Sequence, residues 1–261
     1  MLTKIKNDIK YLQFKNLSDF NNLNHFSSTR IGGLSSGKLE SLNLGYTVND
    51  NPKNVSDNLD LLANTLGFER KQLVSPKQTH SANIGIVKTE NDIFPDTDAL
   101  ITKVPNLCIF IRTADCVPIL LFDPVNKAIA AIHSGWKGTI QKISKLTIDL
   151  MQKEYGTNPK DIIAGIGPSI GREVYEVGSE VIEQFNKSFG NNFCVTPIKD
   201  SKKGLLDLWK VNKKILFDSG IPENQIEIAE ICTYSNPELF YSARRDGVKT
   251  GRLATGIIII E

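Results

Sequence analysis

Two histidines and one cysteine are the residues of this sequence whose types best suit catalysis. The stretch "TADCVPILLFDPVNKAIAAIHSGWKG" places Cys116 and His133 at the ends of two apolar runs, and His80 stands upstream in "KQTHSANI". Each lies next to turn residues, at or near the end of a predicted strand. Two imidazoles and a thiolate suit Zn²⁺, and three protein ligands with an open fourth position are typical of catalytic zinc sites. A His₂Cys set also suits copper.

The same residues support two other interpretations, because their wide spacing matches no compact ligand motif. Without a metal, Cys116 could act as a nucleophile with His133 as its base, and backbone N–H groups of the following "GWKGT" could bind an oxyanion. In the non-catalytic interpretation, the cysteine is buried and the histidines are hydrogen-bonded in the core. Residue type alone does not separate these alternatives.

Polar residues in two further loops are candidate substrate contacts. The segment "SARRDGVKTGR" contains Arg244 and Arg245, and the long early loop contains Arg30. Guanidinium groups suit phosphate or carboxylate, although on charge alone a solvated loop explains this segment slightly better. Asn43, in "SLNLG", could hydrogen-bond a substrate amide or ribose, or could stabilise its own loop as an Asx turn.

Composition excludes several classes of function. The chain has 261 residues and a net charge of +2, so it gives no reason to expect nucleic acid or a membrane surface as a partner. The glycines of "AGIGPSIG" are spaced too widely for a dinucleotide fingerprint. The N-terminal stretch lacks the apolar segment of a signal peptide, so we expect a cytoplasmic protein with reduced cysteines. The thiols are Cys108, Cys116, Cys194 and Cys232.

Hydrophobic periodicity predicts a mixed α/β fold of layered sheets with helices outside, formed as one domain over residues 1–261. An irregular loop is expected over 25–52, followed by a helix with Ser56 as its N-cap and Gly67 as its stop. Further helices are expected at 139–154, 179–189 and 208–218. Strands are expected at 11–14, 83–87, 107–111, 119–122, 128–132, 162–166, 226–231 and 256–260.

Several motifs, taken in order, resemble those of one known family. They are "HFSSTRIGGLSSG", "SLNLG", "KQTHSANI", "DTDALIT", "RTADCVPILLFDP", "AAIHSGWKG", "AGIGPSIGREVYEVG" and "FYSARRDGVKTGRLA". With these the chain resembles the YfiH-type laccase-domain family, also called multicopper polyphenol-oxidase-like proteins. The resemblance covers nearly the whole chain. It departs at Lys137, where arginine is frequent, and at Ala243, where tyrosine is frequent.

The resemblance implies one catalytic zinc held by His80, Cys116 and His133, on a layered α/β fold related to the cysteine-hydrolase architecture of bacterial necrotizing toxins. It implies phosphorolysis of adenosine, inosine and methylthioadenosine, and deamination of adenosine. The substrates would be a purine nucleoside and phosphate, with Arg30, Asn43, Arg244 and Arg245 as candidate contacts.

The family's other associations leave alternatives open. Polyphenol oxidation is attached to members, but the chain's three histidines cannot build a type 1 copper plus a trinuclear cluster. We therefore expect oxidation only as a side activity with Cu²⁺ at the same site. The alternative function is editing of a peptidoglycan precursor by an amidase or hydrolase that uses the same Cys/His site. A third possibility is a metal-bound scaffold without catalysis.

Overall fold

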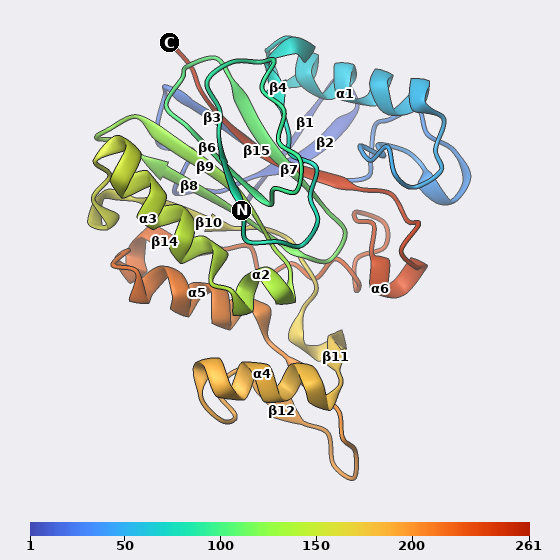
Figure 1. Cartoon of the computed structure of the whole chain (residues 1–261). Coiled ribbons are helices and arrows are strands. Elements are labelled where there is room, and N and C mark those ends of the chain that lie inside the picture. Colours follow the sequence, from blue (N-terminus) through green and yellow to red (C-terminus); the bar gives the residue numbers. More distant parts are fainter.

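Two six-stranded sheets form the centre of the molecule, and helices cover their outer faces (Figure 1). The computed structural model describes residues 1–261. The first sheet has the order β1 (Leu2–Lys6), β2 (Ile9–Gln13), β3 (Leu23–Ser28), β15 (Leu253–Ile259), β7 (Cys108–Thr113) and β4 (Leu73–Val74). The second has the order β14 (Ile226–Ile228), β10 (Ile163–Ile166), β8 (Val117–Asp123), β9 (Ala128–Ser134), β6 (Ala99–Thr102) and β5 (Ile84–Ile86). This confirms the predicted mixed α/β class.

The central strand β8 shows why continuous apolar runs build this fold. Successive side chains of a strand point to opposite faces. Ile119 and Leu121 pack into the core beneath the helices, whereas Leu120 and Phe122 pack between the two sheets. Because both faces are buried, the strand carries no alternating polar positions.

Helices cover the two outer faces unequally. Helix α1 (Pro52–Leu66) packs its apolar residues on the first sheet. The second sheet is covered by α2 (Trp136–Ile140), α3 (Ile143–Tyr155) and α5 (Leu208–Asp218). The last helix, α6 (Ala243–Asp246), is a single turn in the basic loop.

A small subsheet extends away from the main body at the bottom of Figure 1. It consists of β11 (Glu176–Val177), β13 (Gly204–Leu206) and β12 (Val195–Pro197), with α4 (Ser179–Phe189) beside it.

Several of the predicted elements need correction. The strand predicted over 226–231 ends at Ile228, and the strand predicted over 256–260 begins at Leu253. Helix α1 begins earlier than expected, with Asn51 rather than Ser56 as its N-cap, because Pro52 at the first helical position favours a start there. The helix predicted over 139–154 is two helices, separated where Lys142 adopts a left-handed conformation with φ of 56°. The loop predicted from residue 25 begins inside strand β3.

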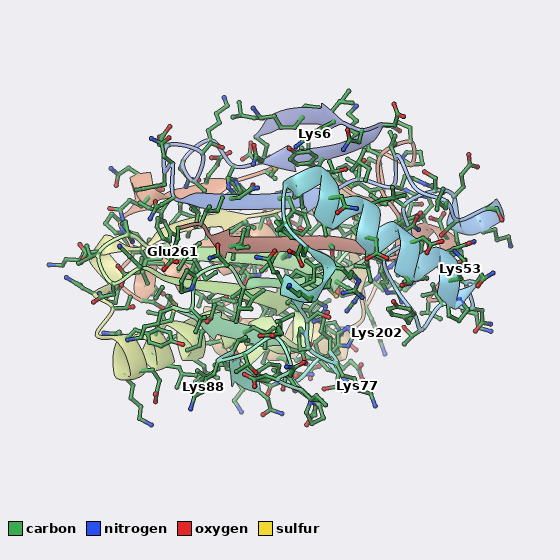
Figure 2. The ribbon with its side chains drawn as sticks, turned by 90° about the horizontal axis from the view of Figure 1, so that it is seen from above. Lys6, Lys53, Lys77, Lys88, Lys202 and Glu261 are labelled. Atoms are coloured by element: carbon green, nitrogen blue, oxygen red, sulfur yellow. The ribbon has the colours of Figure 1, made fainter.

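None of the helices combines the length and the apolar composition that a membrane span requires. Long charged side chains extend outward around much of the molecular outline (Figure 2), as expected from the balanced charge of the sequence.

Candidate active site

Three segments that are far apart in the sequence bring the predicted ligands together. His80 lies in the loop after β4, Cys116 in the turn between β7 and β8, and His133 near the end of β9. One ligand atom from each lies within 4.8 Å of the others. In the β8–β9 ladder Pro118 pairs with His133, so the prediction that the two apolar runs form adjacent strands is confirmed.

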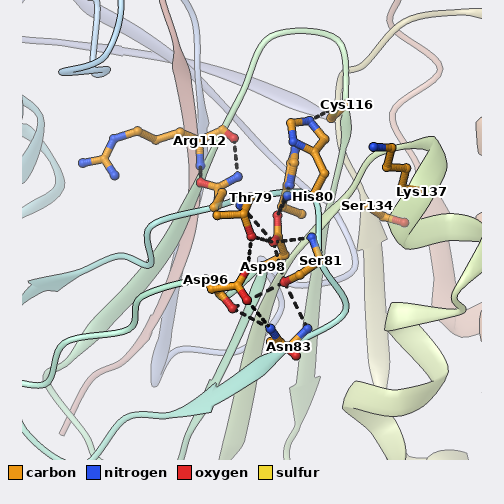
Figure 3. Close-up of polar contacts among 12 residues, drawn as sticks. Thr79, His80, Ser81, Asn83, Asp96, Asp98, Arg112, Cys116, Ser134 and Lys137 are labelled. Carbon is orange, nitrogen blue, oxygen red and sulfur yellow. Dashed lines mark hydrogen bonds and ion pairs between the residues drawn. The ribbon is translucent and has the colours of Figure 1, made fainter.

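The carboxylate of Asp98, just before β6, fixes two of these ligands (Figure 3). Its Oδ1 lies 2.7 Å from Nδ1 of His133 and accepts the backbone N–H of His80 at 3.0 Å. Its Oδ2 accepts the backbone N–H and the hydroxyl of Ser81, both at 2.8 Å. A carboxylate only accepts, so the hydrogen of the imidazole sits on Nδ1 and the Nε2 lone pair is left for a ligand.

Asp98 stays ionised in this environment. Burial alone would raise the pKa of its carboxyl, but the hydrogen bond and charge of His133, with the loop N–H groups, hold that pKa well below its usual range. A negative charge next to His133 increases the basicity of the ring, which strengthens it as a metal ligand.

The thiol and the two imidazoles are electrostatically coupled. The Sγ atom of Cys116 lies 3.8 Å from Nε2 of His80, and the rings of His80 and His133 stand edge to face with centroids 4.9 Å apart. Burial opposes ionisation of Cys116, but the neighbouring histidines outweigh it and lower the pKa of the thiol. Burial likewise opposes protonation of His133, but Cys116 and Asp98 raise its pKa. The thiolate, the form that binds metals, is therefore favoured.

The space around these donors fits a metal ion. A Cβ added at Gly135 would lie 3.0 Å from Sγ of Cys116 and 3.1 Å from Cδ2 of His80, so only glycine leaves the cluster uncrowded. His133 is buried while His80 is exposed, which leaves one side of the cluster accessible. Two nitrogen donors and one sulfur donor match the preferences of zinc and copper.

A cavity of about 640 Å³ adjoins the cluster and includes His80 and His133 in its lining. Its volume falls in the range of small-molecule sites. Its wall also contains Gln78, Arg112 and Arg252. Gln78 pairs through its amide with both backbone groups of Arg112, at 2.7 and 2.8 Å, and so attaches the His80 loop to β7.

Asp115, next to Cys116, has a structural environment. Its carboxylate accepts hydrogen bonds from Thr233 Oγ1 at 2.6 Å, Ser242 Oγ at 2.9 Å and the backbone N–H of Arg244 at 2.7 Å. Its backbone has φ of 88°, which is uncommon outside glycine. Asp115 therefore ties the Cys116 turn to the segments around Thr233 and Ser242.

Three predicted substrate contacts use their polar groups within the protein. Arg30 donates to the carbonyls of Glu40 and Pro237. The amide of Asn43 is buried and forms an Asx-type contact, its Oδ1 accepting the N–H of Gly45 at 3.0 Å. The guanidinium of Arg245 is likewise hydrogen-bonded to the carbonyls of Thr233, Tyr234 and Phe240. None of the three lines the cavity, and their substrate role stays a prediction.

Arg244 differs from these three because it is exposed. Its guanidinium lies 5.0 Å above the ring of Tyr175, and Nη1 donates to the carbonyl of Glu176. Tyr175 is close enough to Cys116 for the thiolate charge to add to burial in raising its hydroxyl pKa. Arg244 is outside the cavity lining but near the cluster, and its substrate role also stays a prediction.

Sequence reasoning missed two residues of the site, Asp98 and Arg112. The signal for Asp98 is a carboxylate directly before an apolar strand in "DTDALIT", since a metal-binding histidine usually donates its other N–H to a carboxylate or carbonyl. The signal for Arg112 is a single cation near the end of the apolar run "LCIFIRT".

Comparisons with known proteins place the chain in a family. A purine nucleoside phosphorylase of Bacteroides thetaiotaomicron is 39% identical over 99% of both chains. The adenosine deaminase RL5, from an unknown prokaryotic organism, is 34% identical over 89% of this chain and 92% of its own. The crystal structure of Bacillus licheniformis YfiH superposes with a TM-score of 0.89 at 32% identity, covering 97% of each chain. The model of the family described as multi-copper polyphenol oxidoreductase laccase matches residues 24–260, and the chain therefore belongs to that family.

Proposed function

We propose that this protein is a zinc-dependent purine nucleoside enzyme. It would cleave adenosine, inosine and methylthioadenosine with phosphate, and convert adenosine to inosine with water. The observation that carries the proposal is the convergence of His80, Cys116 and His133 beside a cavity of about 640 Å³, whose wall includes the two histidines. The names of its relatives, a purine nucleoside phosphorylase and an adenosine deaminase, supply the substrate class.

The chain's own residues would hold and orient the ion. His133 presents Nε2 because Asp98 occupies Nδ1, and Cys116 supplies a thiolate whose ionisation the two histidines favour. His80 is placed by the Asp98 contact to its backbone N–H. When bound, zinc supplies a Lewis acid that acidifies water and stabilises developing negative charge.

The cluster offers too few donors for a multicopper centre. The third histidine, His25, is buried in β3, where its Nε2 accepts the N–H of Phe14 at 2.8 Å. Only two histidines therefore reach the site, and a multicopper oxidase needs many more. We assign any oxidation of phenols to a single Cu²⁺ bound in place of zinc.

Product analysis of the zinc-loaded protein tests the proposal. With adenosine and phosphate it should release adenine and ribose 1-phosphate. Without phosphate it should release inosine and ammonia. Cys116→Ala is the control for contaminating enzymes. The absence of all four products, together with cleavage of a peptidoglycan precursor, would replace this proposal with a cell-wall function.

A further inference from the structure

Arg112 is a half-buried cation without a carboxylate partner in this structure. Its Nε donates to the carbonyl of Leu44 at 2.6 Å, and Nη1 donates to Oγ of Ser75 at 2.8 Å. The guanidinium also stacks on the ring of Phe110, with 4.7 Å to the centroid. The group is therefore fixed in position, while its charge is not neutralised by the protein. Buried charges are normally paired, so this arrangement indicates a site for an anion.

Arg70 brings a second guanidinium to the same cavity. Its one ion-pair contact is long, 3.8 Å from Nε to Oδ1 of Asp60. Burial, followed by the charge of Arg70, lowers the pKa of Arg112 to about 10, so the two cations repel each other. Such repulsion is relieved when an anion lies between two guanidinium groups.

The other charged residues of the cavity do not supply that anion. The carboxylate of Asp92 accepts the backbone N–H groups of Lys88 and Thr89. Glu90 is exposed. Arg252 uses its guanidinium on the carbonyls of Val248, Thr250 and Gly251, so it is committed to its own loop. Lys77 is a third cation of the cavity wall and is exposed, so Arg112 and Arg70 are the two guanidinium groups left to bind an anion.

We propose that Arg112 and Arg70 form the phosphate subsite of the cavity, with the metal cluster at its other end. Figure 3 shows the side chain of Arg112 extending away from Cys116 and His80. The fixed guanidinium suits bidentate binding of phosphate oxygens. The inference rests on the proposed function, because phosphorolysis is the reaction that consumes phosphate.

The chemistry of the bound anion is simple. A phosphate oxygen forms a bond to C1′ of the nucleoside as the C1′–N9 bond breaks. The electron pair of that bond stays on the purine, which takes up the proton of hydrogenphosphate and leaves as the free base. A 5′-phosphate of a nucleotide has the same recognition chemistry, and the experiment separates the two sources.

The test compares two reactions of the zinc-loaded enzyme, since adenosine deamination consumes no phosphate. We expect Arg70→Gln to raise KM for phosphate by about ten- to a hundredfold, the effect of losing a hydrogen bond to a charged group. The ratio of phosphorolysis to deamination at limiting phosphate should fall by the same factor. Arg112→Lys keeps the charge but loses the planar donor set. It should also raise KM for phosphate, and the lysine side chain still fills the half-buried position.

Arg172→Gln, at an exposed arginine paired with Glu173 outside the cavity, is the matched control. A KM for phosphate that stays unchanged in Arg70→Gln and Arg112→Lys but rises in Arg244→Gln would overturn the proposal. The proposal would also be overturned if the variants lost activity only with AMP as substrate, because that result would assign the two arginines to a 5′-phosphate. If the wild-type enzyme performed neither reaction, the proposed function itself would fail, and inorganic phosphate binding by calorimetry would still test the subsite.

Discussion

The ligand cluster and the loops that carry Arg30, Asn43 and Arg245 both contain polar side chains but use them in opposite ways. In the loops, backbone carbonyls and the carboxylate of Asp50 accept the hydrogen bonds of the arginines and the asparagine. In the cluster, Nδ1 of His133 is the one ring nitrogen that Asp98 contacts, and one ligand atom each of His80, Cys116 and His133 lies within 4.8 Å of the others. A polar side chain can bind a ligand only where the protein leaves its donors or acceptors unused. This property distinguishes the residues of a binding site from those that stabilise the fold.

The largest effect should come from removing the thiolate. Cys116→Ala deletes one of three ligands, and we expect more than about a hundredfold loss of activity, because losing even the hydrogen-bond partner of a ligand costs up to that factor. Cys232→Ala is the matched control, since Cys232 is also a half-buried free cysteine. Equal activity of the two variants in a deamination assay would show that the cluster is not the catalytic region.

The two buried aspartates beside the cluster should behave differently. Asp98→Asn weakens the partner of His133, and we expect about ten- to a hundredfold weaker zinc binding in a competitive chelator titration. Asp115→Asn should lower the free energy of unfolding by about 1–3 kcal/mol, because it disturbs three buried hydrogen bonds, while zinc affinity is largely kept. Weaker zinc binding in Asp115→Asn, with zinc affinity unchanged in Asp98→Asn, would contradict the site described here.

Arg245 tests whether the polar residues of the loops have a structural role. Arg245→Gln leaves the carbonyls of Thr233, Tyr234 and Phe240 without their shared donor, and we expect a loss of about 2 kcal/mol in urea unfolding. Lys249→Gln, at an exposed position of the same loop, is the control. A variant with unchanged stability but a raised KM for adenosine would show that Arg245 contacts substrate after all.

We expect the smallest effect from His25, the third histidine, whose contribution to the free energy of unfolding depends on pH. Burial lowers the pKa of His25 to about 4 despite its hydrogen bond with Phe14, whereas an unfolded histidine has a pKa near 6.5. The unfolded state therefore binds more protons between these values. The contribution of neutral His25 is present above pH ~6.5 and is lost as the pH falls towards 4.

Between pH 7 and pH 5 this should cost about 1–2 kcal/mol of the free energy of unfolding. Urea unfolding of wild type and His25→Gln at both pH values provides the measurement. The variant should lose less stability on acidification than the wild type, and parallel losses would show that His25 is not buried in its neutral form.

The sequence predicted elements that carry a long apolar run or a clear helical spacing of apolar residues, but not the short buried strand β6. Strands β8 and β9 are buried on both faces and read as continuous apolar runs, and helices α4 and α5 have the predicted bounds. Strand β3 was missed because its buried residues include His25 and Ser27. Nε2 of His25 is hydrogen-bonded to Phe14 and the hydroxyl of Ser27 to Thr255, and only the folded chain reveals these contacts.

The residues of the site show the same difference between local sequence information and contacts made only in the folded chain. Residue types made His80, Cys116 and His133 candidates, and the family resemblance implied that they form one ligand set. The partner of His133 depends on β6 lying beside β9, and the charge of Arg112 is informative only because no carboxylate reaches it. Long-range pairing of strands is not visible in local sequence, so Asp98 and Arg112 could not be assigned from it.

Metal content is the most direct test of the central claim that His80, Cys116 and His133 hold one ion required for activity. Elemental analysis of purified wild type should find about one zinc per chain, with the same amount in Cys232→Ala. The variants His80→Ala, Cys116→Ala and His133→Ala should contain little zinc, be inactive and remain folded. Full activity of zinc-free wild type, or unchanged zinc in all three ligand variants, would contradict the account.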